Sequence, residues 1–257
     1  MENWENLKVY RNLSPEEVPV RFKEFAHLIF EALEGHGFRL KETKTLKKLY
    51  TINDEFEQSI HFDNSSRWAK NKKDLHIYVC IKPLYSDKEQ LYRIFEAFQI
   101  DASFKMFYPL TQEYRLLAES LTKKIEKHIL PFFDEFSSSE KIVRNCKELV
   151  SYNDFPATVK SPFNPDLQQL LYECSFMQRN KSLFYKLNNE FLMERMEVYE
   201  QLKNDSVSES INEGLINGLR RQLQVFDNET LYEQEIDARH EKASKYVKSL
   251  KIQRRIR

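Results

Sequence analysis

Two histidines and an aspartate fall at positions that could bind a divalent metal. The runs FEQSIHFD (56–63) and DLHIYVCIKP (74–83) alternate apolar and polar residues, which predicts two antiparallel strands. If these strands pair symmetrically about the segment between them, His61 lies beside His76, with Asp63 near both. Imidazole and carboxylate groups are common ligands of divalent metals. The sequence therefore offers a metal-dependent enzyme on this strand face as an alternative hypothesis.

The favoured interpretation of the same face is simpler. His61, His76, Tyr78 and Cys80 are predicted to be ordinary polar residues of a half-solvated sheet, because no close ligand spacing such as HxxxH or CxxC occurs. On this interpretation the chain has no catalytic residues, no cofactor and no bound metal. His61, His76 and Tyr78 are then available to bind a partner.

The segment between the two runs, SSRWAKNKK (65–73), combines one tryptophan with several basic residues. It is predicted to form a long hairpin loop that binds a partner through Arg67, Trp68, Lys70, Lys72 and Lys73. Exposed aromatic and basic side chains are frequent in protein interfaces and can also stack on nucleic-acid bases. The simpler interpretation is a solvated hairpin tip with Trp68 folded over the edge of the sheet. If the loop does bind a partner, an acidic protein surface is preferred to nucleic acid.

The C-terminal stretch RHEKASKYVKSLKIQRRIR (239–257) holds eight basic residues and one acidic residue. Its bases recur at every third position from Arg239 to Arg254, so on a helix of 3.6 residues per turn they wrap around the axis. The same predicted helix begins with acidic residues, and this order of charges complements the helix dipole. RNA or DNA binding through this basic end is a further alternative.

Composition narrows the function classes. The 257 residues include 40 basic and 40 acidic side chains, so no net attraction to nucleic acid is expected. The sequence contains no Gly-rich phosphate loop, GxSxG elbow or HExxH motif. Glu55 and Glu57 would lie on one strand face, where solvated charges explain them better than acid–base catalysis.

Three observations predict a cytoplasmic protein. The N-terminus has no apolar signal-peptide core, and no apolar window is long enough to cross a membrane. Cys80, Cys146 and Cys174 are an odd number of widely spaced cysteines, which is typical of buried free thiols in a reducing compartment.

A helix is expected before the alternating runs, because the sequence contains a helix-start signal and, further along, glycines that can end a helix. Ser14 and Glu17 have the spacing of a capping box, which predicts a helix beginning at Pro15. Two of the four glycines, Gly35 and Gly37, lie in EGHGF, where one of them can take the left-handed conformation that ends a helix. Further strands are expected at 39–45 and 49–53.

The remainder of the chain is predicted to be helical. LYRIFEAF (91–98) has helical spacing, and a longer helix from about Thr111 is expected to kink or end at Pro131. A proline-rich linker is predicted at 152–165. We therefore expect an α+β domain over 1–151, with an antiparallel sheet covered on one face by helices, and an all-α antiparallel bundle over 166–257.

Residues 22–63, FKEFAHLIFEALEGHGFRLKETKTLKKLYTINDEFEQSIHFD, resemble the opening of a widespread bacterial family of domains of unknown function. Its members begin with an amphipathic helix ending in "L..GF", followed by an aromatic strand and a strand of the "Q.i.fq.S" type. The resemblance covers roughly 15–135, and its motif is a helix cap with strand alternation. Some relatives look like proteins of toxin–immunity loci, which implies a binding role for this chain.

Taken together, these patterns predict a non-catalytic protein-binding module with an immunity-like or regulatory role. Another protein is the expected partner, nucleic acid is the less favoured one, and no membrane association is expected. The patterns leave the oligomeric state and the identity of the partner open.

Overall fold

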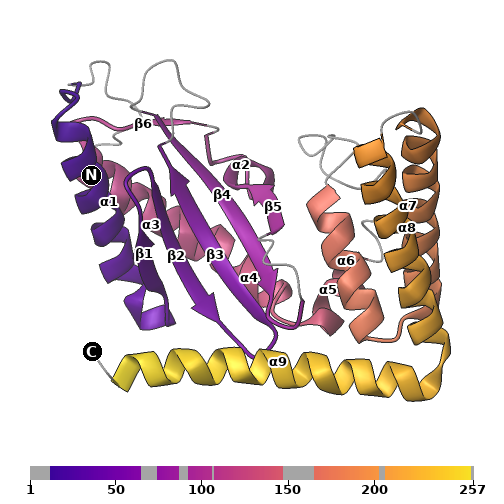
Figure 1. Cartoon of the computed structure of the whole chain (residues 1–257). Coiled ribbons are helices and arrows are strands. Elements are labelled where there is room, and N and C mark those ends of the chain that lie inside the picture. Colours follow the sequence, from indigo (N-terminus) through magenta and orange to yellow (C-terminus); the bar gives the residue numbers. More distant parts are fainter. Residues whose placement is uncertain are drawn as a thin grey trace. The chain divides into compact units, whose positions relative to one another are not determined.

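A computed structural model describes residues 12–64, 74–86, 92–105, 107–146, 165–202 and 206–255 (Figure 1). The chain is an α+β protein that forms two compact units, and each unit is described separately below. The first holds the antiparallel sheet with its covering helices, and the second is helical.

The first helix, α1 (Glu17–Leu33), begins two residues after the predicted start at Pro15. The backbone N–H of Ser14 donates to Glu17 Oε2 at 2.7 Å, and the N–H of Glu17 donates to Ser14 Oγ at 3.3 Å. These reciprocal bonds satisfy two donors that a helix start leaves without partners. The capping box is therefore confirmed.

Gly37 ends this helical segment. A short 3₁₀ turn, η2 (Glu34–His36), follows α1, and Gly37 then adopts φ 81° while its N–H donates to the carbonyl of Glu34 at 2.9 Å. A β-carbon is disfavoured in this left-handed region, which is why glycine is used. The next residue, Phe38, is buried and packs against Phe133. The centroids of the two rings are 6.3 Å apart.

The two neighbouring glycines provide a matched test of this assignment. Gly37→Ala is expected to lower the free energy of unfolding by about 1–2 kcal/mol, because alanine must enter the left-handed region. Gly35→Ala is expected to be neutral or slightly stabilising, because Gly35 has no left-handed φ and nothing within 4 Å of an added β-carbon. Urea unfolding of both variants measures the difference, and equal effects would contradict the assigned role of Gly37.

The sheet of the first unit is antiparallel in the order β1–β2–β3–β4–β5. Its strands are β1 (Arg39–Glu42), β2 (Leu46–Ile52), β3 (Phe56–Asp63), β4 (Asp74–Pro83) and β5 (Tyr92–Glu96), and β6 (Tyr108–Pro109) pairs with the start of β4. β3 and β4 have the predicted bounds. The short β5 was not expected from the local pattern.

The helix predicted over 91–98 is wrong for most of its length. Residues Tyr92–Glu96 form β5, and only α2 (Ala97–Ile100) is helical. A short apolar run does not by itself distinguish a strand from a helix. Here the edge of β4 offers backbone hydrogen-bonding groups, so pairing such as Val79 with Phe95 decides the conformation.

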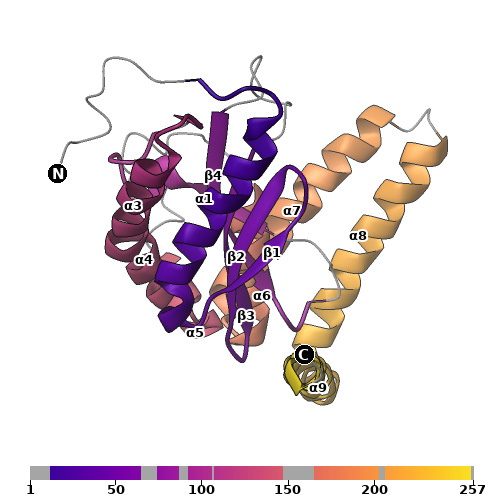
Figure 2. The same cartoon turned by 90° about the vertical axis from the view of Figure 1, so that its left-hand side faces the viewer.

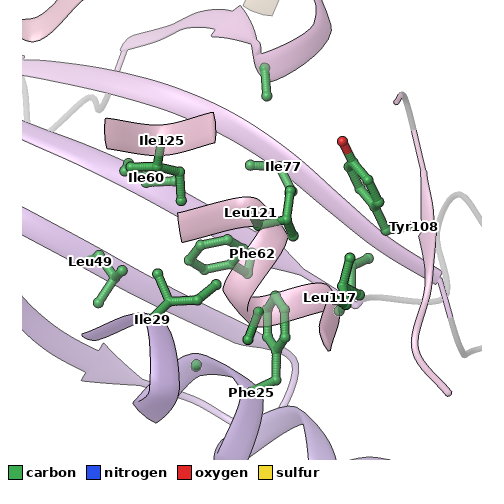
Figure 3. Packing of buried hydrophobic residues seen from close by; sticks show 14 of the residues in the cluster. Phe25, Ile29, Leu49, Ile60, Phe62, Ile77, Tyr108, Leu117, Leu121 and Ile125 are labelled. Carbon is green, nitrogen blue, oxygen red and sulfur yellow. The ribbon is translucent and has the colours of Figure 1, made fainter. Parts of the chain in front are cut away.

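Helices cover one face of the sheet and enclose the core of the first unit. Phe25 and Ile29 of α1 meet Leu121 of α3 (Tyr114–Lys124) over Ile60 and Phe62 of β3 (Figure 3). The rings of Phe25 and Phe62 meet edge to face at 5.4 Å. Burial of these apolar side chains is the main force that holds the helices on the sheet.

The helical segment after α3 contains Pro131 and accommodates it with a π-helical turn. A π-helical turn, η3 (Ile125–Ile129), precedes α4 (Leu130–Glu135), so the chain stays helical through the proline. A wide turn accommodates a residue that has no N–H and whose ring crowds the preceding turn. It also shifts the buried face by one residue, so Phe133 is buried and Phe132 is only partly buried.

The second unit consists of helices. These are α5 (Ser139–Cys146), α6 (Pro165–Met177), α7 (Lys181–Leu202), α8 (Ser206–Asp227) and α9 (Glu229–Arg255). α7 and α8 form an antiparallel hairpin, whereas α9 runs across their direction (Figures 1 and 2). The predicted helical region is thus present, and its last helix leaves the direction of the hairpin.

The predicted domain boundary at 152–165 stays a prediction. The second compact unit includes α5, which packs against α6. Tyr85 belongs to the same unit, and its hydroxyl lies 3.0 Å from Ser139 Oγ and 3.6 Å from Cys174 Sγ. The predicted linker 152–165 lies outside the described residues except for Pro165, which begins α6.

Candidate functional site

The two histidines of the predicted metal site are not directly opposite each other. His61 of β3 pairs with Tyr78 of β4, and His76 pairs with Asp63. Alternation determines only which face a side chain takes, so a shift of two residues in register keeps every residue on its predicted face. Tyr78 lies between the histidines, with its ring centroid 4.8 Å from that of His61 and 5.6 Å from that of His76.

The prediction that these histidines lie on a half-solvated face is wrong. His61 is 2% exposed and His76 is 6% exposed. Ser59 Oγ and His61 Nε2 are hydrogen-bonded at 2.9 Å, and Glu57 forms an ion pair with Lys48 of β2. Polar groups buried in this way are stabilised by partners from the same sheet. The role of His61 and His76 in binding a partner stays a prediction.

The hydrogen-bonded pair of Ser59 and His61 contains a nucleophile and a base at a suitable distance. Both side chains are buried, however, so a substrate has no access to them in this structure. Among the described residues, no group of three or more His, Cys, Asp or Glu side chains could hold a metal ion. The geometry therefore gives no support to the alternative of an enzyme that uses His61, His76 and Asp63.

The other predicted binding residues lie in the part of the chain that the structure does not describe. Arg67, Trp68, Lys70, Lys72 and Lys73 all belong to residues 65–73, between β3 and β4. Their role in binding a partner stays a prediction. Tyr78, the remaining member of the predicted set, is partly buried between the two histidine rings.

The basic residues of α9 do not all face solvent. Arg239 donates from Nη1 to Glu173 Oε2 of α6 at 2.9 Å and from Nε to Glu235 Oε1 at 2.8 Å. Lys242 Nζ donates to the carbonyl of Ser86 at 2.9 Å, and Lys245 pairs with Glu241 at 2.7 Å. Phosphate groups would have to compete with these contacts. Of these three bases only Arg239 is largely buried, so the nucleic-acid alternative stays a prediction.

The cysteine prediction is confirmed for the two cysteines whose side chains are described. Cys80 and Cys174 are buried free thiols. Cys174 lies beside the hydroxyl of Tyr85, and burial raises the pKa of that hydroxyl well above its usual value. Tyr85 is therefore a neutral phenol near neutral pH, which suits a structural contact in the interior of the second unit.

Exposed apolar side chains of the α7–α8 hairpin were not anticipated from the sequence. Met193 is 64% exposed, Met196 51%, Ile211 60% and Leu215 44%. Met193 and Met196 belong to α7, whereas Ile211 and Leu215 belong to α8. For α7 the sequence does contain an indication of this exposure. The two methionines fall outside the helical stripe of apolar residues that includes the buried Phe184 and Leu187.

These four residues lie in the half of the hairpin next to its connection. The antiparallel alignment is given by the hydrogen bond from Asn188 Nδ2 to the carbonyl of Leu219 at 3.3 Å. Met193 and Met196 follow Asn188 along α7, and Ile211 and Leu215 precede Leu219 along α8. We call this part of the hairpin, 193–202 and 206–215, the free half.

The glycines of GLING (214–218) lie at the edge of the same region. Gly214 and Gly218 have no heavy atom within 4 Å of an added β-carbon, apart from their chain neighbours and the backbone of α8 itself. Within the described chain no other helix packs closely against these two glycines. They leave that side of α8 open.

Comparisons with known proteins do not assign the chain to a family. No family model, curated protein or solved structure matches the chain. In the parts of the chain that the structure describes, no helix is long and apolar enough to span a membrane. The resemblance to the "L..GF" family stays a prediction, and the function is inferred from the chain's own surfaces.

Proposed function

We propose that the chain is a non-catalytic protein-binding module with an immunity-like or regulatory role. The exposure of Met193, Met196, Ile211 and Leu215 on the free half of the hairpin carries this proposal. Apolar surface in water is unfavourable, and protein interaction sites expose more of it than the rest of the surface does. A partner that covers these side chains would remove that cost.

The architecture supports the same proposal. α7 and α8 are packed at one end by a cluster of aromatic rings that includes Phe184 and Phe226, stacked at 4.1 Å between centroids. This packing joins α7 to α8 at the base from which the free half extends, and a preorganised surface loses less entropy when a partner binds. The loop 65–73 would be a second contact surface of the module.

Apolar-to-polar substitutions in the free half test the proposal. Met193→Gln/Met196→Gln and Ile211→Gln/Leu215→Gln are each expected to weaken partner binding by about tenfold or more, because each removes two apolar contacts. The partner would be captured from the native cytosol by tagged protein, then purified and titrated against each variant. Glutamine is a good helix former, so the melting temperature should stay within about 2 °C.

Leu231→Gln in α9 provides the matched control, because Leu231 is also exposed (44%) but lies outside the free half. This variant should bind like the wild type. Equal affinity of all three variants would contradict a role of the free half in binding. Trp68→Ala/Arg67→Ala examines the loop separately and should weaken binding without lowering the melting temperature.

A further inference from the structure

The sulfur-containing side chains that the structure describes differ in their exposure to solvent. Cys80 and Cys174 are 1% and 0% exposed, whereas Met193 and Met196 are 64% and 51% exposed. Met177, at the end of α6, has an intermediate exposure. Buried cysteines are inert, because reagents cannot reach them. Within the described chain, a small oxidant in solution therefore meets the two methionine sulfurs of α7 first.

The two methionines lie where oxidation leaves the interior of the second unit intact. They are three residues apart on α7, so they are neighbours on the helix surface. The buried side of α7 is formed instead by residues such as Phe184 and Leu187. Oxidation of a buried methionine disrupts the packing around it, whereas an oxygen added at an exposed position stays in water. Oxidation here therefore changes the surface of the free half and not the fold.

A peroxide is sufficient to oxidise each of these sulfurs. A lone pair of the thioether sulfur attacks one oxygen of hydrogen peroxide, and the O–O bond breaks. The sulfur keeps that oxygen and becomes a sulfoxide, while the second oxygen leaves as water with both hydrogens. The sulfur loses two electrons and the peroxide gains them, so no further reactant is needed. The product side chain is polar, whereas the thioether is apolar.

Methionine sulfoxide at these positions is also open to reduction. Thiol-dependent reductases convert the sulfoxide back to the thioether, while two thiols become a disulfide and the oxygen leaves as water. Such an enzyme must reach the sulfur, and the exposure of Met193 and Met196 permits this. Each reductase acts on one epimer of the sulfoxide, so complete reversal needs both types of enzyme.

We infer that Met193 and Met196 form a reversible oxidation site that regulates partner binding by the free half. This inference rests on the proposed function, because it names the regulation of the surface proposed there. In the reduced chain the two thioethers are apolar and flexible, so they add contact area with a partner. In the oxidised chain the sulfoxides must lose bound water before a partner covers them, which costs free energy. Binding is therefore stronger in the reduced chain.

The α8 side of the free half limits the size of this effect. Ile211 and Leu215 contain no sulfur and stay apolar under oxidation. A partner that contacts both helices keeps these contacts. Oxidation is therefore expected to weaken binding about tenfold, as expected for Met193→Gln/Met196→Gln, and not to abolish it.

Peptide mass spectrometry of the folded full chain tests the site without a partner. The chain is treated with hydrogen peroxide for increasing times, then digested with trypsin, which separates Met193 from Met196 by cleaving after Arg195. Both are expected to be oxidised at least about fivefold faster than Met177. In urea the three rates should become similar, because the difference arises from the fold. Equal rates in the folded chain would overturn the inference.

Titration of the captured partner tests the regulation. The matched variant Met193→Leu/Met196→Leu keeps apolar side chains and good helix formers, but it forms no sulfoxide at these positions. It also keeps every other methionine of the chain. Before peroxide treatment, wild type and variant should bind equally. After treatment and removal of the peroxide, the wild type should bind about tenfold more weakly, whereas the variant should stay within about twofold. Treatment with both reductases should restore the wild type.

Two results of this titration would overturn the inference. An equal loss in the wild type and the leucine variant would assign the effect to other residues. Unchanged binding by the oxidised wild type would refute the regulation, and weaker binding by Ile211→Gln/Leu215→Gln would then leave the proposed function standing. Failure of the proposed function would show differently, as partner binding that neither glutamine double variant weakens. Circular dichroism before and after treatment should show the same helix content, so that a loss of binding reports on the surface.

Discussion

Arg239→Ala is expected to lower the free energy of unfolding of the second unit by about 3–5 kcal/mol, because it leaves the carboxylate of Glu173 buried without its charged partner. Arg239 joins α9 to α6 through Glu173, and its guanidinium also lies 4.5 Å from the ring centroid of Phe176. Burial alone would lower the pKa of Arg239, but the Glu173 carboxylate raises it above its ordinary value. Arg239 therefore stays charged at neutral pH.

The test compares single and double variants by urea unfolding, with hydrogen exchange of α6 and α9 as a local probe. Glu173→Met/Arg239→Met should regain most of the stability lost in Arg239→Ala, since an apolar pair has no buried charge to satisfy. Lys245→Ala is the control on the same helix, because its pair with Glu241 is exposed and should contribute little. A loss no larger than that of Lys245→Ala would contradict the assigned importance of the Arg239–Glu173 pair.

Phe184→Ala is expected to have an effect of similar size, about 3–5 kcal/mol, because it removes a large ring from the base of the α7–α8 hairpin. Phe184 is completely buried, and its ring stacks on Phe226 at 4.1 Å and on Tyr172 at 5.0 Å. Phe176 meets it edge to face at 5.5 Å. The substitution would leave a cavity where three other rings converge.

Thermal and urea unfolding of Phe184→Ala, Phe184→Leu and Met193→Ala would measure this contribution. The leucine variant should lose less than the alanine variant, because it fills part of the volume. Met193→Ala should be close to neutral, because Met193 lies on the same helix but is exposed. If Phe184→Ala resembled Met193→Ala, the aromatic cluster would not be the base of the hairpin.

The element boundaries near the N-terminus could be predicted because they depend on contacts between close neighbours in sequence. Ser14 and Glu17 are three residues apart, and Gly37 bonds to Glu34. Such interactions are already specified by residue type and spacing. The same holds for β3 and β4, whose alternation is read directly along each strand.

Gln58 shows why burial could not be predicted in the same way. The alternation placed this polar residue among apolar ones on the core face of β3, with no partner in the local sequence. In the structure its amide donates to the carbonyls of Phe133 and Phe136 at 2.7 and 3.0 Å, at the end of α4. Those carbonyls are far away in sequence, so only the folded chain brings donor and acceptors together.

For the candidate site residues, too, the local sequence predicted some properties and only the folded structure determined others. Residue types and periodicity were sufficient to place His61, His76 and Asp63 on one face, but not to determine their register or exposure. The exposed methionines of α7 were overlooked, because a methionine outside the main apolar stripe is equally compatible with a second buried contact. Which side chains stay exposed depends on the helices that pack against α7.

The sequence by itself determined the α+β class, the helix ends at Ser14 and Gly37, and the positions of β3 and β4, because these follow from interactions within a few residues. Only the tertiary structure decided the register of His61 with Tyr78, the strand conformation of 92–96, the burial of Arg239 and the exposure of the free half. Each of these depends on segments distant in sequence that compete for the same hydrogen bonds and the same apolar surface.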